Sequence, residues 1–209
     1  MDINRAQTAF FIGPRVNKLT GYNSLSYGRL MQYLRHYVYD TYYRRHIRSF
    51  VTGGEQGFDQ LAFDAVHNNR IYYPEMNINN VLMLPFHGQD ARWSDTGIFG
   101  RNEYRRMLEK ATTIFYSHDG PCDSNPARLM AERNDAMLSM SSHCIGLWPD
   151  DDTWRDEYAP IYTADKYTAD TLRKAMKVGC SIDIIRYKID VVATIEKQMI
   201  VPLRVDKIA

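Results

Sequence analysis

Short apolar runs alternate along the chain with longer segments in which apolar residues recur every three or four positions. Thr8 to Ile12 is such a run, and Gly13-Pro14 ends it, so we predict a buried strand there. From Asn23 to about Arg48, Leu30, Leu34 and Val38 lie four residues apart, as on one face of a helix. The same patterns predict strands at 49–52, 80–86, 112–117, 143–148 and 181–189, and helices at 58–69, 101–111, 127–140 and 168–178.

This alternation predicts an α/β fold, a Rossmann-like three-layer sandwich with a mainly parallel central sheet and helices on both faces. We expect residues 1–209 to form a single domain with a C-terminal extension from about residue 190. The pattern from Val191 to Ala209 favours a short helix and a strand. The stretch from Pro149 to Tyr167 is acidic, aromatic and irregular, so we expect a loop there.

Composition narrows the class of protein. Of 209 residues, 44% are apolar and 24% are charged, and 26 basic residues balance 25 acidic ones to a net charge of +1. That balance gives no strong nucleic-acid signal, and no apolar run is long enough for a membrane span. Three widely spaced cysteines, without CxxC or HExxH patterns, indicate no disulfide framework, metal or other cofactor. We expect a cytoplasmic protein with no membrane partner.

Tyrosine is unusually common, with 15 residues, many of them between Tyr22 and Tyr43. A tyrosine side chain combines an apolar ring with a polar hydroxyl and therefore suits interfaces. We expect a homo-oligomer, and one hypothesis is a structural, self-associating protein whose pocket is vestigial.

The strongest chemical signal is the turn Gly53-Gly54-Glu55-Gln56-Gly57, which lies between a predicted strand and a predicted helix. Glycines let the backbone approach a ligand closely, and the start of a helix offers unpaired N–H groups and a positive dipole end, which together suit a phosphate. The turn has neither the Gly-Lys-Ser/Thr of a Walker loop nor the GxGxxG of a dinucleotide fold. A tight turn without a ligand explains these glycines equally well.

Two charged side chains lie where they could contact the same ligand. Arg15 follows the first strand, and the carboxyl ends of parallel strands meet at one edge of a sheet, so its guanidinium could clamp a phosphate. The alternative is a solvated surface arginine. Asp59 opens the helix after the glycine turn, where it either complements the helix dipole or binds a ribose hydroxyl or a base amine.

Three adjacent polar residues, Glu132, Arg133 and Asn134, belong to the predicted helix at 127–140. Arg133 and Asn134 could face the cleft. Glu132 could act as a general base, although a lone glutamate on a helix is usually solvated. No Ser-His-Asp or Cys-His set is indicated, so we assign no catalytic residue.

Four segments in order resemble motifs of the SLOG superfamily, specifically its small bacterial and phage branch, the YpsA-like proteins. Residues 11–22 are similar to the opening TGHRPNKLGGY of that branch, and residues 52–62 to its turn SGGALGVDQWA. Residues 85–93 resemble its PFxxQxxxW, and residues 131–141 its RNxxMVDxSD helix. The order and approximate spacing hold from about Ala9 to Trp148.

The resemblance implies a Rossmann-like fold that binds nucleotides or nucleotide-derived ligands. Some relatives cleave nucleotide glycosidic bonds, and others sense NAD-like ligands. Carried over by matching position, the pocket residues are Gly13, Arg15, Gly53, Gly54, Gly57, Asp59, Gln60, Gln89, Trp93, Arg133 and Asn134.

Two departures from the branch matter. Pro14 stands where the branch has the histidine of GHR. No GGTxN turn follows the strand at 143–148, and Thr168, which begins the next predicted helix, is a weaker substitute. Because related enzymes hold phosphate with that late turn, its absence favours binding over turnover.

We therefore predict a protein that binds a nucleotide, or a ligand derived from NAD or ADP-ribose, through phosphate contacts of the glycine turn. It would act as a sensor or a sequestering protein. The alternative is a nucleotide or nucleoside N-glycosidase or ribosyltransferase. Such an enzyme needs a carboxylate beside the anomeric carbon, and Glu132, Asp59 and Glu55 are the candidates.

Overall fold

The computed structural model describes residues 3–21, 24–122, 125–156, 166–192 and 197–208. Its strands form one sheet in the order β4-β3-β2-β1-β5-β6-β7, in which each neighbouring pair is parallel except β6 and β7. The strands are β1 (Thr8–Ile12), β2 (Ser49–Thr52), β3 (Asn79–Leu84), β4 (Thr113–Tyr116), β5 (His143–Pro149), β6 (Ser181–Val192) and β7 (Lys197–Ile208). This sheet confirms the predicted α/β class.

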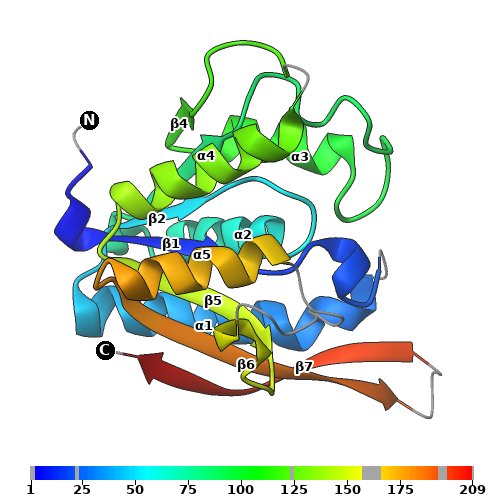
Figure 1. The fold of residues 1–209 in the computed structure, drawn as a ribbon. Coiled ribbons are helices and arrows are strands. Elements are labelled where there is room, and N and C mark those ends of the chain that lie inside the picture. Colours follow the sequence, from blue (N-terminus) through cyan, green and yellow to red (C-terminus); the bar gives the residue numbers. More distant parts are fainter. Residues whose placement is uncertain (1–2, 22–23, 123–124, 157–165, 193–196, 209) are drawn as a thin grey trace.

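Helices cover both faces of the sheet (Figure 1). They are α1 (Gly28–Arg45), α2 (Phe58–Tyr72), α3 (Arg101–Lys110), α4 (Pro126–Ser139) and α5 (Lys166–Lys177). The side chains of β1 alternate between the two layers, because successive residues of a strand point to opposite faces. Ala9 and Phe11 pack in the core with α1 and α2, whereas Phe10 and Ile12 pack in the core with α4 and α5.

The strand order reverses at β1, which pairs with β2 on one side and with β5 on the other. In open α/β sheets, ligands bind beyond the carboxyl ends of the strands at such a switch point. The turns that follow β1 and β2 therefore lie at the position where this architecture most often builds a site.

The helix α1 is shorter than the segment from Asn23 to Arg48 that the sequence predicts. A 3-10 turn (Ser24–Tyr27) precedes its first residue, and Asn23 lies outside the described residues. The helix ends at Arg45 because His46 adopts a left-handed conformation with φ of 56°.

The C-terminal segment differs from the predicted short helix and strand. Within the described residues, no helix follows α5, and β7 pairs antiparallel with the whole length of β6. Ile200 is fully buried in the core cluster of α1, and β-branched residues favour a strand at such a position. Pro202 is tolerated because β7 is an edge strand.

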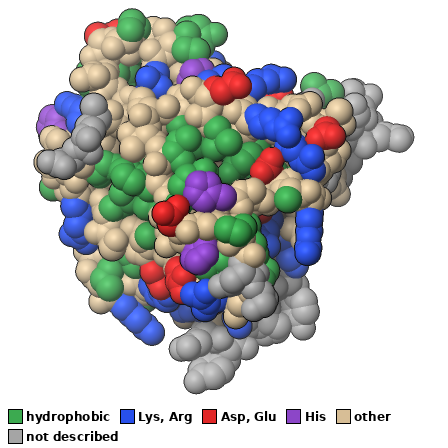
Figure 2. Space-filling view, turned by 90° about the horizontal axis from the view of Figure 1, so that it is seen from above, with side chains coloured by type: hydrophobic (Ala, Val, Ile, Leu, Met, Phe, Trp, Pro, Cys, Tyr) green, Lys and Arg blue, Asp and Glu red, His purple; other side chains and the backbone are tan. Residues whose placement is uncertain are grey.

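The surface mixes charges of both signs. Viewed from the side of β4, acidic and basic side chains are interspersed, and hydrophobic side chains and histidines gather near the middle of the face (Figure 2). No helix in the described ranges has the length and apolar character needed to cross a membrane. Three exposed tyrosines are in contact where α1 meets the end of α2: the Tyr39 ring centre lies 4.8 Å from that of Tyr43 and 5.0 Å from that of Tyr73. Self-association through them stays a prediction.

A buried ionic cluster fastens α1 to β5 and β6. Asp183 is 1% exposed, and its carboxylate accepts hydrogen bonds from Arg45 Nη2 at 2.9 Å and from the Tyr37 hydroxyl. His143 Nε2 lies 3.5 Å from the same carboxylate. Burial raises the pKa of Asp183, but the His143 ring, the Tyr37 hydroxyl and the Arg45 charge lower it more, so the pKa is below its usual value.

Asp183→Asn is expected to lower the free energy of unfolding by about 2–3 kcal/mol at pH 7, because Arg45 loses its carboxylate at a partly buried site. A carboxyl with a lowered pKa stabilises the fold above its unfolded pKa of about 4 and loses that contribution below it. Urea titrations should therefore show a smaller difference from the wild type at pH 3 than at pH 7. Asp40→Asn, in an exposed pair with Arg44, is the control and should have little effect. Equal stability of the Asp183 variant and the wild type at pH 7 would contradict this role.

Candidate functional site

The turns that follow β1 and β2 pack directly against each other. Val16 N donates to Gln56 O at 3.2 Å, and Phe58 N donates to Pro14 O at 3.2 Å. Gly57 has φ of 110°, and a Cβ there would lie 2.7 Å from Val16 N. The close approach of the two turns thus requires a glycine at position 57.

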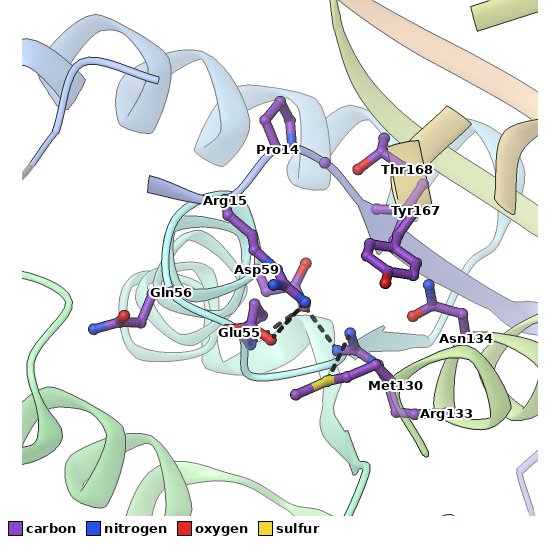
Figure 3. A pocket seen from close by; sticks show the side chains of 12 residues that line it. Pro14, Arg15, Glu55, Gln56, Asp59, Met130, Arg133, Asn134, Tyr167 and Thr168 are labelled. Carbon is purple, nitrogen blue, oxygen red and sulfur yellow. Dashed lines mark hydrogen bonds and ion pairs between the residues drawn. The ribbon is translucent and has the colours of Figure 1, made fainter. Parts of the chain in front are cut away.

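An internal carboxylate occupies the glycine turn. Asp59 Oδ2 accepts hydrogen bonds from Gly53 N at 3.1 Å, from Arg133 Nη1 at 3.1 Å and from Glu55 N at 3.4 Å. Figure 3 shows the Arg133 head beside the Asp59 carboxylate. Both members of the ion pair are 4% exposed. Two backbone donors and one guanidinium therefore converge on a single buried oxygen, an arrangement that suits an oxyanion.

The missing side chain of Gly53 leaves room for the Arg133 guanidinium. A Cβ on Gly53 would lie 1.2 Å from Arg133 Nη1 and 2.7 Å from Asp59 Oδ2. Any larger residue would displace the arginine head from the turn. The absence of a side chain at position 53 is therefore needed for the ion pair itself.

Burial and charge set the electrostatics of this pair. Burial, the largest cause, raises the pKa of Asp59 to about 6, while the charge of Arg133 lowers it and that of Glu55 raises it. Arg133 uses few of its donors within the described residues: Nη2 lies 3.9 Å from Met130 Sδ, and the buried Nε has no hydrogen-bond partner. A buried guanidinium normally satisfies more of its N–H groups.

The rim of the site comes from the turns that follow β1 and β2 and from the helices α4 and α5. Arg15 Nη2 lies 3.6 Å from Glu55 Oε2, and its guanidinium lies over the Tyr167 ring, 5.6 Å from the ring centre. Asn134 Nδ2 donates to Thr171 Oγ1 at 3.0 Å, which ties α4 to α5. The rim therefore joins a cation, an aromatic face and an amide.

A cavity of about 20 Å³ lies inside this rim. Such a volume holds about one water molecule. The structure brings five of the residues proposed from the family motifs together in its lining, namely Gly13, Arg15, Asp59, Arg133 and Asn134.

Other proposed residues lie elsewhere. Gly54 and Gln89 contact each other beside α3, where Gln89 Nε2 donates to Gly54 O at 3.2 Å. Trp93 packs on Tyr104, with ring centres 5.2 Å apart. Gln60 is 1% exposed in α2, and its amide has no hydrogen-bond partner among the described residues. These residues are outside the lining of the cavity.

Several residues that line the cavity were not predicted from the sequence as site residues, namely Pro14, Gln56, Met130 and Tyr167. Thr168, at the start of α5, lines the cavity in the region where the family has its late glycine turn. Pro14 and Gln56 lie within the matched motifs, whereas the signal for Met130 and Tyr167 was proximity to a predicted helix start. Glu132 is exposed and pairs with Arg128, so it is not a carboxylate of this site.

Comparison with known proteins identifies the family. A family model described as the YspA SLOG family matches residues 25–182. The chain belongs to this family. The resemblance seen in the sequence motifs is thereby confirmed, and SLOG proteins are in general Rossmann-like and nucleotide-related.

The chain is also similar to a curated protein and to a solved structure. An uncharacterized SPbeta prophage-derived protein, YoqJ of Bacillus subtilis (strain 168), is 32% identical over 109 residues, which cover 47% of this chain and 60% of YoqJ. The chain thus spans less than two thirds of that relative. The X-ray structure of DNA processing protein A (DprA) from Streptococcus pneumoniae matches with 12% identity and a TM-score of 0.45, over 84% of this chain and 48% of DprA.

Proposed function

We propose that this chain binds the phosphate of a nucleotide, or of a ligand derived from NAD or ADP-ribose, between the ends of β1 and β2 and the helices α4 and α5. Arg133 carries the proposal: it is a buried cation with an unpartnered Nε, next to two converging backbone N–H groups. Burying a cation is costly unless anions and hydrogen-bond acceptors surround it. A bound phosphate supplies both.

Asp59 occupies the position that a phosphate oxygen would take. Its Oδ2 receives the three donors that an anionic ligand would need. Because burial raises the pKa of Asp59 to about 6, the carboxyl accepts a proton at moderate pH and then releases much of its hold on Arg133. An incoming phosphate would compete with this carboxylate for the same donors.

Arg15→Gln is expected to weaken ligand binding about ten- to a hundredfold, since a charge-assisted hydrogen bond to phosphate contributes about 1.5–3 kcal/mol. Isothermal calorimetry with AMP, NAD and ADP-ribose measures this effect. Arg15 is 37% exposed in its side chain, so the fold should tolerate the change. Arg44→Gln, at a 78% exposed arginine of α1, is the matched control and should bind as the wild type does. Equal affinity of the Arg15 variant and the wild type would remove Arg15 from the site.

Asp59 also favours a second candidate function, cleavage of the N-glycosidic bond. A buried carboxyl with a pKa of about 6 matches the requirement for general acid–base catalysis near neutral pH. Its Oδ2 is held by three donors, however, which favours binding over attack on a sugar. Chromatography of the same three ligands after incubation separates the two functions, because only an enzyme releases a free base.

A further inference from the structure

A groove of about 260 Å³ runs between α4 and α5 beside the cavity. Its lining includes Asn134 and Tyr167, which also line the cavity, so the two spaces adjoin. The cavity, at about 20 Å³, has room for about one oxygen atom of a ligand's anionic end, whereas ligand pockets usually measure about 300–1,000 Å³. The remainder of any nucleotide must lie outside the cavity, and the groove adjoins it.

Asn134 marks the junction of cavity and groove. It is 5% exposed, and its Nδ2 is used by Thr171, but its Oδ1 has no hydrogen-bond partner among the described residues. Figure 3 shows its amide beside Tyr167, at the wall of the cavity. A buried amide oxygen left unpaired is unfavourable, and a sugar hydroxyl is a donor of suitable size.

The far part of the groove is basic. Lys174 and Lys177 line it, one turn apart on α5. Lys174 pairs with Asp135 at 2.5 Å, but both side chains are about half exposed, so the pair is weak and can exchange for another anion. Arg173 is tied to Asp170 and to the carbonyl of Trp154, which leaves the two lysines as the adaptable cations.

We propose that this groove binds the sugar and a second phosphate of an extended nucleotide, with a sugar hydroxyl on Asn134 Oδ1 and the phosphate on Lys174 and Lys177. The inference rests on the proposed phosphate site in the cavity. It specifies the ligand class as a nucleotide in which a sugar separates two anionic groups.

Adenosine 3′,5′-bisphosphate and AMP test the groove, because they differ only in the second phosphate. The wild type should bind the bisphosphate about fivefold more tightly or better, as expected for contacts of one phosphate with exposed lysines. The double variant K174Q/K177Q should lose this preference and keep the affinity for orthophosphate. Lys207→Gln, on β7, is the control and should keep the preference.

The outcomes separate the two proposals. A wild type that binds AMP and the bisphosphate equally, or a double variant that keeps the preference, overturns the groove and leaves the phosphate site intact. A wild type that binds none of orthophosphate, AMP and the bisphosphate overturns both. Calorimetry at low and high salt adds a check, because the preference should shrink as salt screens the lysines.

Discussion

Gly57→Ala is expected to lower the free energy of unfolding by about 3–5 kcal/mol, from backbone strain of about 1–3 kcal/mol and steric overlap of similar size. Gly57 has φ of 110°, a conformation that residues with a side chain rarely adopt. An added Cβ would lie 2.7 Å from Val16 N and 2.9 Å from both Arg15 C and Pro14 O. These are backbone atoms, so no side-chain rotation can relieve the overlap.

Gly97→Ala is the matched control. Gly97 has φ of 98°, and no atom lies within 4 Å of a Cβ placed there. This variant should therefore show the strain alone, about 1–3 kcal/mol and less than the loss in the Gly57 variant. Urea denaturation followed by circular dichroism gives the free energy of unfolding of both variants. If only the Gly57 variant fails to fold, the prediction is also supported, because its loss of stability is then larger still. Equal losses would mean that the contact between the two turns does not require the glycine.

The fold could be predicted from the sequence because its determinants are local. The continuous apolar run of β1 and the four-residue spacing of Leu30, Leu34 and Val38 each report a buried element directly. The C-terminal strand could not be predicted in the same way, because β7 is half-buried at the sheet edge and its conformation depends on pairing with β6. A half-buried strand lacks the continuous apolar run that marks a strand buried on both faces.

The site was predicted only in outline. The glycine turn and Arg15 lie close together because they follow neighbouring parallel strands, and the buried face of α4 adds Arg133 and Asn134. The ion pair between Asp59 and Arg133 joins residues 74 positions apart, and no local pattern indicates which side chain turns inward. The ion pair by itself requires a glycine at position 53. The glycines alone therefore could not distinguish a phosphate-binding turn from a tight turn without a ligand.

Arg133→Met is expected to lower the free energy of unfolding by about 3–5 kcal/mol at pH 8, because it leaves the Asp59 carboxylate buried without a counter-ion. Methionine keeps much of the volume and the straight chain of arginine, so packing changes little. The same variant should lose phosphate binding. Urea denaturation gives the stability, and calorimetry with AMP gives the affinity.

The pH dependence of the stability loss in Arg133→Met tests whether the unpaired Asp59 carboxylate causes that loss. Burial raises its pKa in the folded protein to about 6, so its proton stabilises the fold below the unfolded pKa, and that stability is lost as the pH rises through about 6. Removal of the Arg133 charge raises this pKa further, so Arg133→Met should be much less unstable at pH 5 than at pH 8. The double variant D59N/R133M carries no buried charge and should recover much of the stability at pH 8. An equal loss at both pH values, with no recovery in the double variant, would mean that Arg133 stabilises the turn by packing rather than by its charge.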